Sequence, residues 1–175
     1  LAKSPEHQAV LKKLRKAQRD LAVKTRDVGF LPEDDLHSLA EGSTPYDVGH
    51  DPSKYDLETV LTTAEDASSL SADKTESLVR RLSDRNRAVR YWAALGLLMR
   101  GEAGLKAGHA QLVVANTIYV AMLALNALDE LDGRAASAID QIKALPTKSE
   151  TRYPRMDAYI PNLKTKTLDD LQAAK

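Results

Sequence analysis

The chain has 175 residues, and its 25 Lys and Arg balance its 25 Asp and Glu, so the formal net charge is zero. This balance excludes the overall basic excess of a protein that wraps nucleic acid and the acidic excess of a solvating tail. A hydrophobic content of 43% is too high for a disordered chain. No apolar run approaches the ~20 residues that span a bilayer. We therefore expect one domain over residues 1–175, with no nucleic-acid partner and no membrane.

The charges are unevenly distributed along the chain. Residues 1–26 carry eight basic and two acidic side chains, residues 27–76 carry two and thirteen, and residues 77–175 carry fifteen and ten. Segments of opposite charge attract one another. We therefore expect the basic face of a helix at 5–26 to lie near the acidic region 33–66, or one of the two to face a partner.

The composition favours an all-α fold, because Ala and Leu dominate the apolar residues and β-branched residues are fewer. The absence of cysteine excludes a disulfide framework, a thiolate nucleophile and a cysteine-ligated zinc site. Leu1 begins a strongly charged stretch that lacks the apolar centre of a signal peptide. We expect a fragment of a longer protein or a processed chain.

An N-terminal segment, residues 1–29, carries the pattern of an amphipathic helix over 5–26. Ser4 and Pro5 are typical of an N-cap and a first helical position, and Gly29 is the expected C-terminal cap. The apolar stripe has 4-3-4-7 spacing and consists of Val10, Leu14, Ala17, Leu21 and Val28. Lys and Arg fill the opposite face.

An acidic connector follows over residues 30–54. Pro32 opens a short helix whose first turn is acidic, and Gly42 closes it. The stretch 42–54 is rich in turn formers, which predicts an ordered but irregular connection.

Residues 55–145 have the pattern of helix pairs. The expected helices are 57–68 with Asp56 as its cap, 71–82, 87–100, an irregular one at 103–114, 117–131 and 134–145. The apolar run 91–98 aligns with 121–128 at an offset of 30 residues, which is typical of a helical repeat. We therefore predict an all-α, HEAT-like superhelix of helix pairs. The expected core residues are Trp92, Leu95, Leu98, Leu125 and Leu128.

The last segment, residues 146–175, changes character. Pro146, Pro154 and Pro161 should break any long helix. We expect an extended C-terminal tail across the repeats, followed by a short helix that begins at Thr167.

Several residues could bind ions, but ordinary surface roles are favoured for each. The four histidines, His7, His37, His50 and His109, include no pair at the i+3 or i+4 spacing that suits a metal. The aspartates Asp47, Asp51 and Asp56 lack the spacing of an EF-hand, so we interpret the acidic region as a solvated surface.

Two basic groups suggest anion binding. One is the face of helix 5–26, which has no interleaved aromatic residues for single-stranded nucleic acid, so a solvated face or docking onto the acidic region is favoured. The other is the arginine cluster Arg80, Arg81, Arg85, Arg87 and Arg90. We favour a structural role for this cluster, in which Asp84 caps a helix end and pairs with an arginine of a neighbouring repeat.

Three stretches resemble a known family. They are Arg26-Asp27-Val28-Gly29-Phe30-Leu31-Pro32-Glu33, then Tyr91-Trp92-Ala93-Ala94-Leu95-Gly96-Leu97 after Val89-Arg90, and Ala124-Leu125-Asn126-Ala127-Leu128-Asp129 followed by Gly133. Their order and spacing resemble the C-terminal region of bacterial sulfatases of the arylsulfatase family. In that family a HEAT-like helical extension follows an alkaline-phosphatase-like α/β domain, and the resemblance covers most of residues 10–145.

The resemblance implies a parent enzyme that hydrolyses sulfate esters with a calcium ion and a formylglycine made from Cys or Ser. The Cys/Ser-x-Pro-x-Arg motif for that formylglycine is absent from this chain. We therefore assign it no catalytic residue, no cofactor and no metal, and expect calcium and formylglycine in a catalytic domain that is not part of the chain. Export from the cytoplasm is usual in the family.

The resulting interpretation is a non-catalytic C-terminal module that packs on a sulfatase catalytic domain or shapes access to its site. Arg26, Asp27, Phe30 and Tyr46 are the expected contact residues, because they lie in the least regular part of the chain. The alternative is a freestanding HEAT-like adaptor that binds a peptide or protein on its concave face. An independent enzyme is the weakest interpretation.

Overall fold

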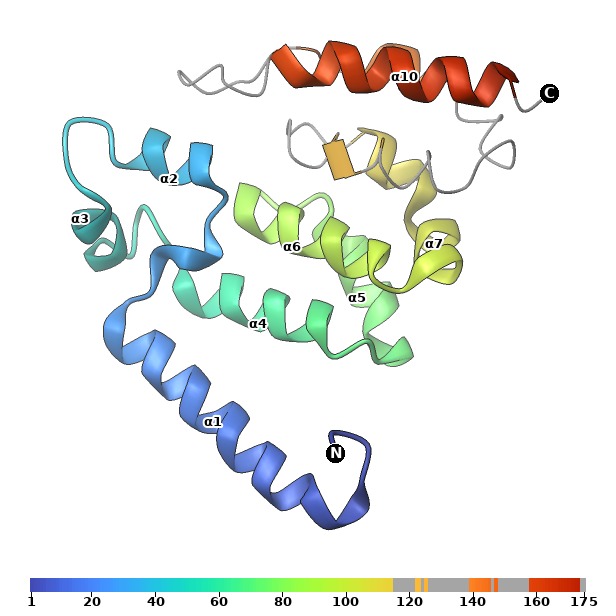
Figure 1. The fold of residues 1–175 in the computed structure, drawn as a ribbon. Coiled ribbons are helices and arrows are strands. Elements are labelled where there is room, and N and C mark those ends of the chain that lie inside the picture. The colour runs from blue at the N-terminus through green and yellow to red at the C-terminus, as the bar shows by residue number, and fades with distance from the viewer. Residues whose placement is uncertain (115–121, 124, 126–138, 146, 148–157, 174–175) are drawn as a thin grey trace.

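The computed structural model describes residues 1–114, 122–123, 125, 139–145, 147 and 158–173. These residues form helices, turns and loops, with no strand among them (Figure 1). The all-α class is thus confirmed. The HEAT-like superhelix stays a prediction, because most of the helix expected at 117–131 lies outside the described residues, as does Leu128.

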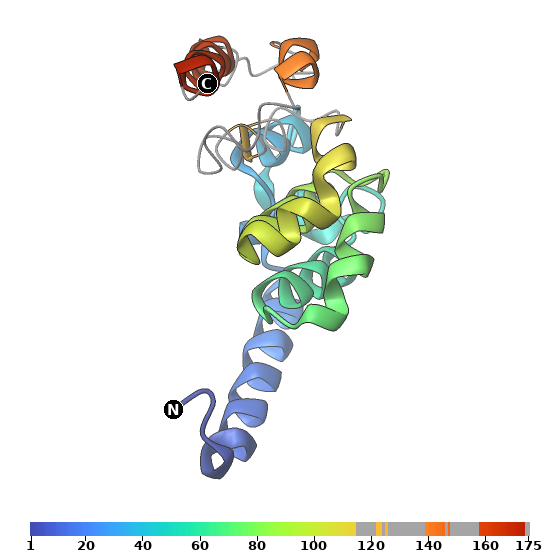
Figure 2. The same cartoon turned by 90° about the vertical axis from the view of Figure 1, so that its right-hand side faces the viewer.

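The elements follow one another in a simple order. The α-helices are α1 (Gln8–Thr25), α2 (Glu33–Leu39), α3 (Pro45–His50), α4 (Leu57–Ser68), α5 (Thr75–Arg81), α6 (Arg87–Leu98), α7 (Gly101–Val114), α9 (Ile139–Ala144) and α10 (Tyr159–Ala173). Single 3-10 turns are η1 (Pro5–His7), η2 (Val28–Phe30) and η3 (Ala72–Lys74). The arrangement is elongated: α4 to α7 form the middle, α1 projects from one end, and α10 lies at the other (Figure 2).

The core of the middle part lies where α4, α5 and α6 meet. Its buried members are Ala67, Leu78, Leu82, Ala93, Ala94 and Leu97. Trp92 and Leu98 are only half-buried against this cluster, and Leu95 is half-buried too, whereas Leu97 is fully buried. The core residues expected on α6 were therefore wrong, because its buried side is rotated by part of a helical turn from the predicted one. Leu125 is fully buried as expected, with α9 and α10.

Small residues set how closely α6 approaches α4. A Cβ built at Gly96 would lie 2.7 Å from the Cβ of Ala67 and 3.0 Å from Cδ1 of Leu78. Real Cβ atoms do not come so close without a shift of the neighbour. The small face of α6 therefore turns toward α4, which is why Leu95 is displaced from the centre of the core.

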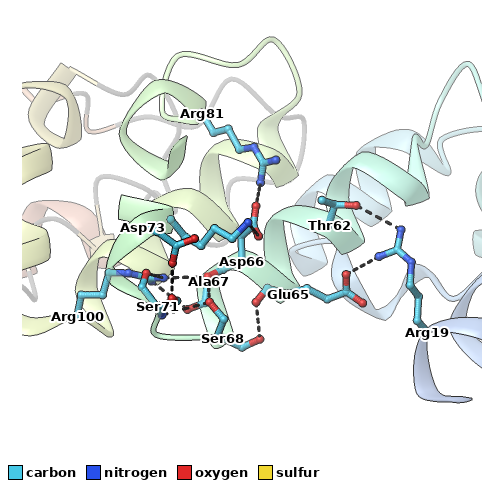
Figure 3. A network of polar contacts seen from close by, with 12 residues as sticks. Arg19, Thr62, Glu65, Asp66, Ala67, Ser68, Ser71, Asp73, Arg81 and Arg100 are labelled. Atoms are coloured by element: carbon cyan, nitrogen blue, oxygen red, sulfur yellow. Dashed lines mark hydrogen bonds and ion pairs between the residues drawn. The ribbon is translucent and has the colours of Figure 1, made fainter. Parts of the chain in front are cut away.

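Arg100 fixes the carboxyl end of α4, whose last carbonyl groups have no partner within the helix. Its guanidinium donates to the backbone oxygens of Asp66 at 2.9 Å, Ala67 at 3.0 Å and Ser71 at 3.1 Å, and to that of Gly96 at 2.7 Å (Figure 3). A cation at this end also complements the helix dipole. One side chain thus ties the end of α4 to α6.

The carboxylate of Asp66 adds a second tie from α4 to its neighbours. It accepts from Arg81 of α5 at 2.9 Å, and Lys74 lies 3.3 Å away. Its side chain is 16% exposed, so this pair is less screened by solvent than a surface ion pair.

Some predicted helix ends are confirmed and others are wrong. Asp56 caps α4 as expected, with its Oδ1 3.1 Å from the Thr59 nitrogen. At the start of α6 the cap is Asn86 instead of Asp84, because the Asn86 side chain accepts from Ala88. Gly29 does not end α1; Arg26 does so in a left-handed conformation, with φ 52°.

Two segments are more helical than expected. The stretch 42–54 contains α3, because Thr44 and Asp47 form a reciprocal capping box. The C-terminal helix begins at Tyr159, eight residues before Thr167, since Pro161 lies in the first turn where no amide donor is needed. Thr167 lies inside α10 and donates to the Leu163 oxygen at 2.9 Å. The rest of the expected tail, 148–157, lies outside the described residues.

The close approach of α4 and α6 makes a first prediction. Gly96→Ala should lower the free energy of unfolding by about 1–3 kcal/mol, because the added methyl group overpacks the contact with Ala67. In an unpacked helix the same change would stabilise by ~1 kcal/mol through helix propensity. Urea unfolding followed by circular dichroism measures the sign. A stabilised Gly96→Ala variant would show that the two helices are not in this contact.

Candidate docking surface

The four expected contact residues do not form one surface. Arg26 is exposed and Tyr46 is 70% exposed, and the Tyr46 ring stacks on that of His50 at 3.9 Å between centroids. The Asp27 carboxylate accepts from the Gly29 nitrogen at 2.8 Å, so it shapes the turn η2. Phe30 faces inward.

Phe30 joins the connector to the helices of the middle part. Its ring lies 6.1 Å from that of Trp92, and its backbone oxygen accepts from the Trp92 indole nitrogen at 2.8 Å. A buried indole N–H needs such a partner. The two residues are 62 positions apart, and they come from the first and second of the stretches that carry the family resemblance.

Tyr55 makes a second link to the connector. It is buried, and its hydroxyl donates to the Asp27 backbone oxygen at 3.0 Å. Burial raises the pKa of the Tyr55 phenol well above its usual value. The connector is therefore held from two sides, by Trp92 of α6 and by Tyr55 before α4.

A cleft of about 1150 Å³ lies between the connector and the amino ends of α4 and α6. Arg26, Tyr55 and Glu58 line it together with the turn 84–88. Of the four expected contact residues, Arg26 is the one among its lining residues. The lining mixes basic, acidic and apolar side chains, so the cleft does not present one charge.

The acidic region is less solvated than expected, because Asp34 is 2% exposed and Asp35 is 7% exposed. Asp35 lines the cleft, and its Oδ1 lies 3.5 Å from Nη1 of Arg87. Burial raises the pKa of the Asp35 carboxyl group above its ordinary value of 3.8, against the opposing effect of the Arg87 charge. This pair was not predicted, because the two residues are far apart in sequence.

The expected attraction between the basic helix and the acidic region is confirmed at one point. Arg19 of α1 donates to Glu65 of α4 at 2.5 Å and to the Thr62 hydroxyl at 3.3 Å (Figure 3). It also donates to Glu58 at 2.5 Å. Arg19 is 29% exposed, so its contacts are partly shielded from salt.

The apolar face of α1 is open to solvent. We call Val10, Leu14, Ala17 and Leu21 the α1 stripe. Leu14 is 61% exposed, Leu21 is 60% and Val10 is 55%, and Ala17 is exposed as well. Ala22, on another side, is the one buried residue of α1. This stripe is the principal exposed apolar group that the described residues present, and such patches mark interaction sites.

The arginine cluster is largely structural, as favoured. Arg80 pairs with Glu76, Arg81 with Asp66 and Arg87 with Asp35. Arg90 donates to the backbone oxygens of residues 84 and 85, at 2.6 and 3.1 Å. The expected pair between an arginine and the Asp84 carboxylate is replaced, because that carboxylate accepts from the backbone nitrogen of residue 86 at 2.7 Å.

The three histidines whose side chains are described each contact a residue close in sequence. His37 lies 3.5 Å from Glu33, His7 lies 3.5 Å from Glu6, and the His50 ring contacts the Tyr46 oxygen at 2.8 Å. The His109 side chain lies outside the described part. Within that part of the chain, no three His, Cys, Asp or Glu side chains are grouped to hold a metal ion.

No described helix is both long and apolar enough to cross a membrane. Comparison with known proteins found no match: no family model, no curated protein and no solved structure is similar to this chain.

The left-handed residue at the end of α1 makes a second prediction. Arg26→Gly should raise the free energy of unfolding by about 1 kcal/mol, because glycine adopts a positive φ without steric cost. Lys24→Gly, inside the helix, should lower it by ~1 kcal/mol. Denaturant midpoints of the two variants measure this contrast. Loss of stability in Arg26→Gly equal to that of Lys24→Gly would mean that the Arg26 side chain is itself needed for the fold.

Burial of Asp35 makes a third prediction, on pH. Folding raises the pKa of the Asp35 carboxyl group. The contribution of this group to the free energy of unfolding is therefore fully present below the ordinary pKa of 3.8, and it is lost as the pH rises through the folded-state pKa. Asp35→Asn should therefore gain stability relative to the wild type as the pH rises from 3.5 to 7.

Arg87→Gln is the matched control for Asp35→Asn, because it removes the charge that lowers this pKa and should enlarge the decline with pH. Urea midpoints of the three proteins at each pH give the comparison. A difference between Asp35→Asn and the wild type that does not change with pH would contradict the raised pKa.

Proposed function

We propose that the chain is a non-catalytic helical module of a sulfatase, and that it packs on the catalytic domain of the parent protein. The observation that carries this proposal is the contact of Phe30 with Trp92. It joins the two most distinctive stretches of the family resemblance, 26–33 and 91–97. Residues that resemble one family and also build one unit support a common origin better than separate matches would.

The geometry of the connector fits such a role. Stretch 26–33 turns the chain from α1 into α2 and is fixed by Trp92 and Tyr55. It therefore holds α1 at a set position beside α4. A rigid turn that presents a projecting helix suits a module that packs on a neighbouring domain.

The chemistry of sulfate-ester hydrolysis belongs, in this proposal, to the catalytic domain, with its calcium and formylglycine. The helical module supplies contact area to that domain. The cleft, whose lining charges are of both signs, is assigned no part in the chemistry. Its effect on the reaction is to stabilise the catalytic domain and to shape access to its site.

The alternative, a freestanding adaptor, also uses an exposed apolar face, so the α1 stripe fits both. The sulfatase module and the freestanding adaptor predict different genes. A Cys/Ser-x-Pro-x-Arg motif upstream in the same reading frame is expected for the sulfatase module. A reading frame that opens just before Leu1 would remove that proposal and leave the adaptor.

A fourth prediction concerns activity. The full-length product of the reading frame should hydrolyse an aryl sulfate, and residues 1–175 alone should not, because the nucleophile lies in the other domain. Release of the phenol from such a substrate measures turnover by each protein. Turnover by residues 1–175 would overturn the assignment of the chemistry to another domain, and a full-length protein that is inactive after confirmed formylglycine formation would count against the sulfatase itself.

A further inference from the structure

The α1 stripe is regular enough to pack against another protein surface. Val10, Leu14, Ala17 and Leu21 follow a 4-3-4 spacing, so at 3.6 residues per turn Leu14 and Leu21 lie only about 20° apart around the helix axis. All four are exposed. Their spacing forms one narrow apolar line along the helix.

This line does not face the body of the molecule. Ala22, which is buried, is about 100° around the axis from Leu21, since each residue turns a helix by that angle. Arg19 reaches α4 from the same side as Ala22. Only this carboxyl-terminal part of α1 lies beside α4, and the rest projects beyond the body (Figures 1 and 2).

The charges around the α1 stripe indicate an acidic occupant. Lys13 flanks it on one side, and Lys24 stands at the next position of the same line. Of the two acids in residues 1–26, Asp20 is paired with Lys16 at 2.6 Å, and Glu6 lies in η1 before the stripe, 3.5 Å from His7. An apolar surface bordered by carboxylates would complement both the stripe and these lysines.

Two other occupants fit less well. A helix pair made from two copies would have only two heptads, whereas stable coiled coils sustain the repeat over about three to four. A membrane-surface helix usually carries Trp or Phe on its apolar face, and residues 1–29 contain no aromatic residue other than histidine.

We propose that the α1 stripe is the surface by which this module docks on the catalytic domain, and that it meets an apolar patch bordered by acidic side chains. This inference rests on the proposed function and names the contact within it. Lys13 and Lys24 set the register of the contact, and Leu14 and Leu21 supply its apolar centre.

Hydrogen exchange tests the proposal in the full-length product of the reading frame and in residues 1–175 alone. In the short chain the amides of residues 12–21 should exchange rapidly, because one side of α1 contacts little. In the full-length protein the exchange rates of these amides should be lower by about tenfold or more, because docking suppresses local opening of the helix.

Matched variants separate docking from helix stability. Leu14→Gln with Leu21→Gln should abolish the extra protection in the full-length protein while the amides of α4 and α6 stay protected. Lys13→Glu should weaken it, and Lys12→Glu should not, because Lys12 makes the same charge change on the opposite side of the helix.

Equal exchange of α1 in the full-length protein and in residues 1–175 would overturn the proposal, as would equal effects of Lys13→Glu and Lys12→Glu. This failure differs from failure of the proposed function. A full-length sulfatase with an unprotected α1 would remove the docking surface and keep the function. A reading frame without a catalytic domain would remove both.

Discussion

The contact between Trp92 and Phe30 joins two parts of the chain that lie 62 positions apart in sequence, and the position of the connector depends on it. The indole nitrogen of Trp92 donates to the Phe30 oxygen at 2.8 Å while the two rings pack at 6.1 Å. A neutral hydrogen bond of this kind contributes only about 1 kcal/mol, but an indole N–H left buried without a partner would cost more. The connector must therefore stay in place for α6 to remain as it is, and the position of α1 depends on the connector.

The middle of the molecule is tied in a different way. Gly96 allows α6 to lie against Ala67 of α4, and Arg100 closes the end of α4 through its backbone oxygens. The close backbone approach at Gly96 and the hydrogen bonds of Arg100 thus both hold α4 against α6. Together with the connector they form a base from which α1 projects (Figure 1). The α1 stripe is open to solvent.

Sequence patterns predicted the local features and missed those that depend on the neighbours. The helix content and the cap at Asp56 were correct, because spacing and capping act within a few residues. Leu95 was expected in the core, where Leu97 is found instead. The sequence of a helix that is apolar all round does not show which of its sides faces the neighbouring helix. The pair of Asp35 and Arg87 has no local signal at all.

The candidate site was predictable in part. The apolar spacing of α1 is visible in the sequence, but its exposure is not, because the same spacing is typical of a helix packed on its own domain. Arg26 at the end of α1 was missed because glycine is the usual residue there, and the nearby Gly29 matched that expectation. A Cβ at Gly49 would lie 2.7 Å from the Arg26 oxygen, so α3 packs closely against this turn.

The central claim is that connector and helices form one cooperative unit joined at Trp92. Trp92 is the single tryptophan of the chain, so tryptophan fluorescence reports on the surroundings of this one side chain. Urea unfolding followed by tryptophan fluorescence and by far-ultraviolet circular dichroism is the most direct measurement. The two curves should have the same midpoint. A fluorescence change that comes at lower urea than the loss of helix would show that the connector separates first, and would contradict the account.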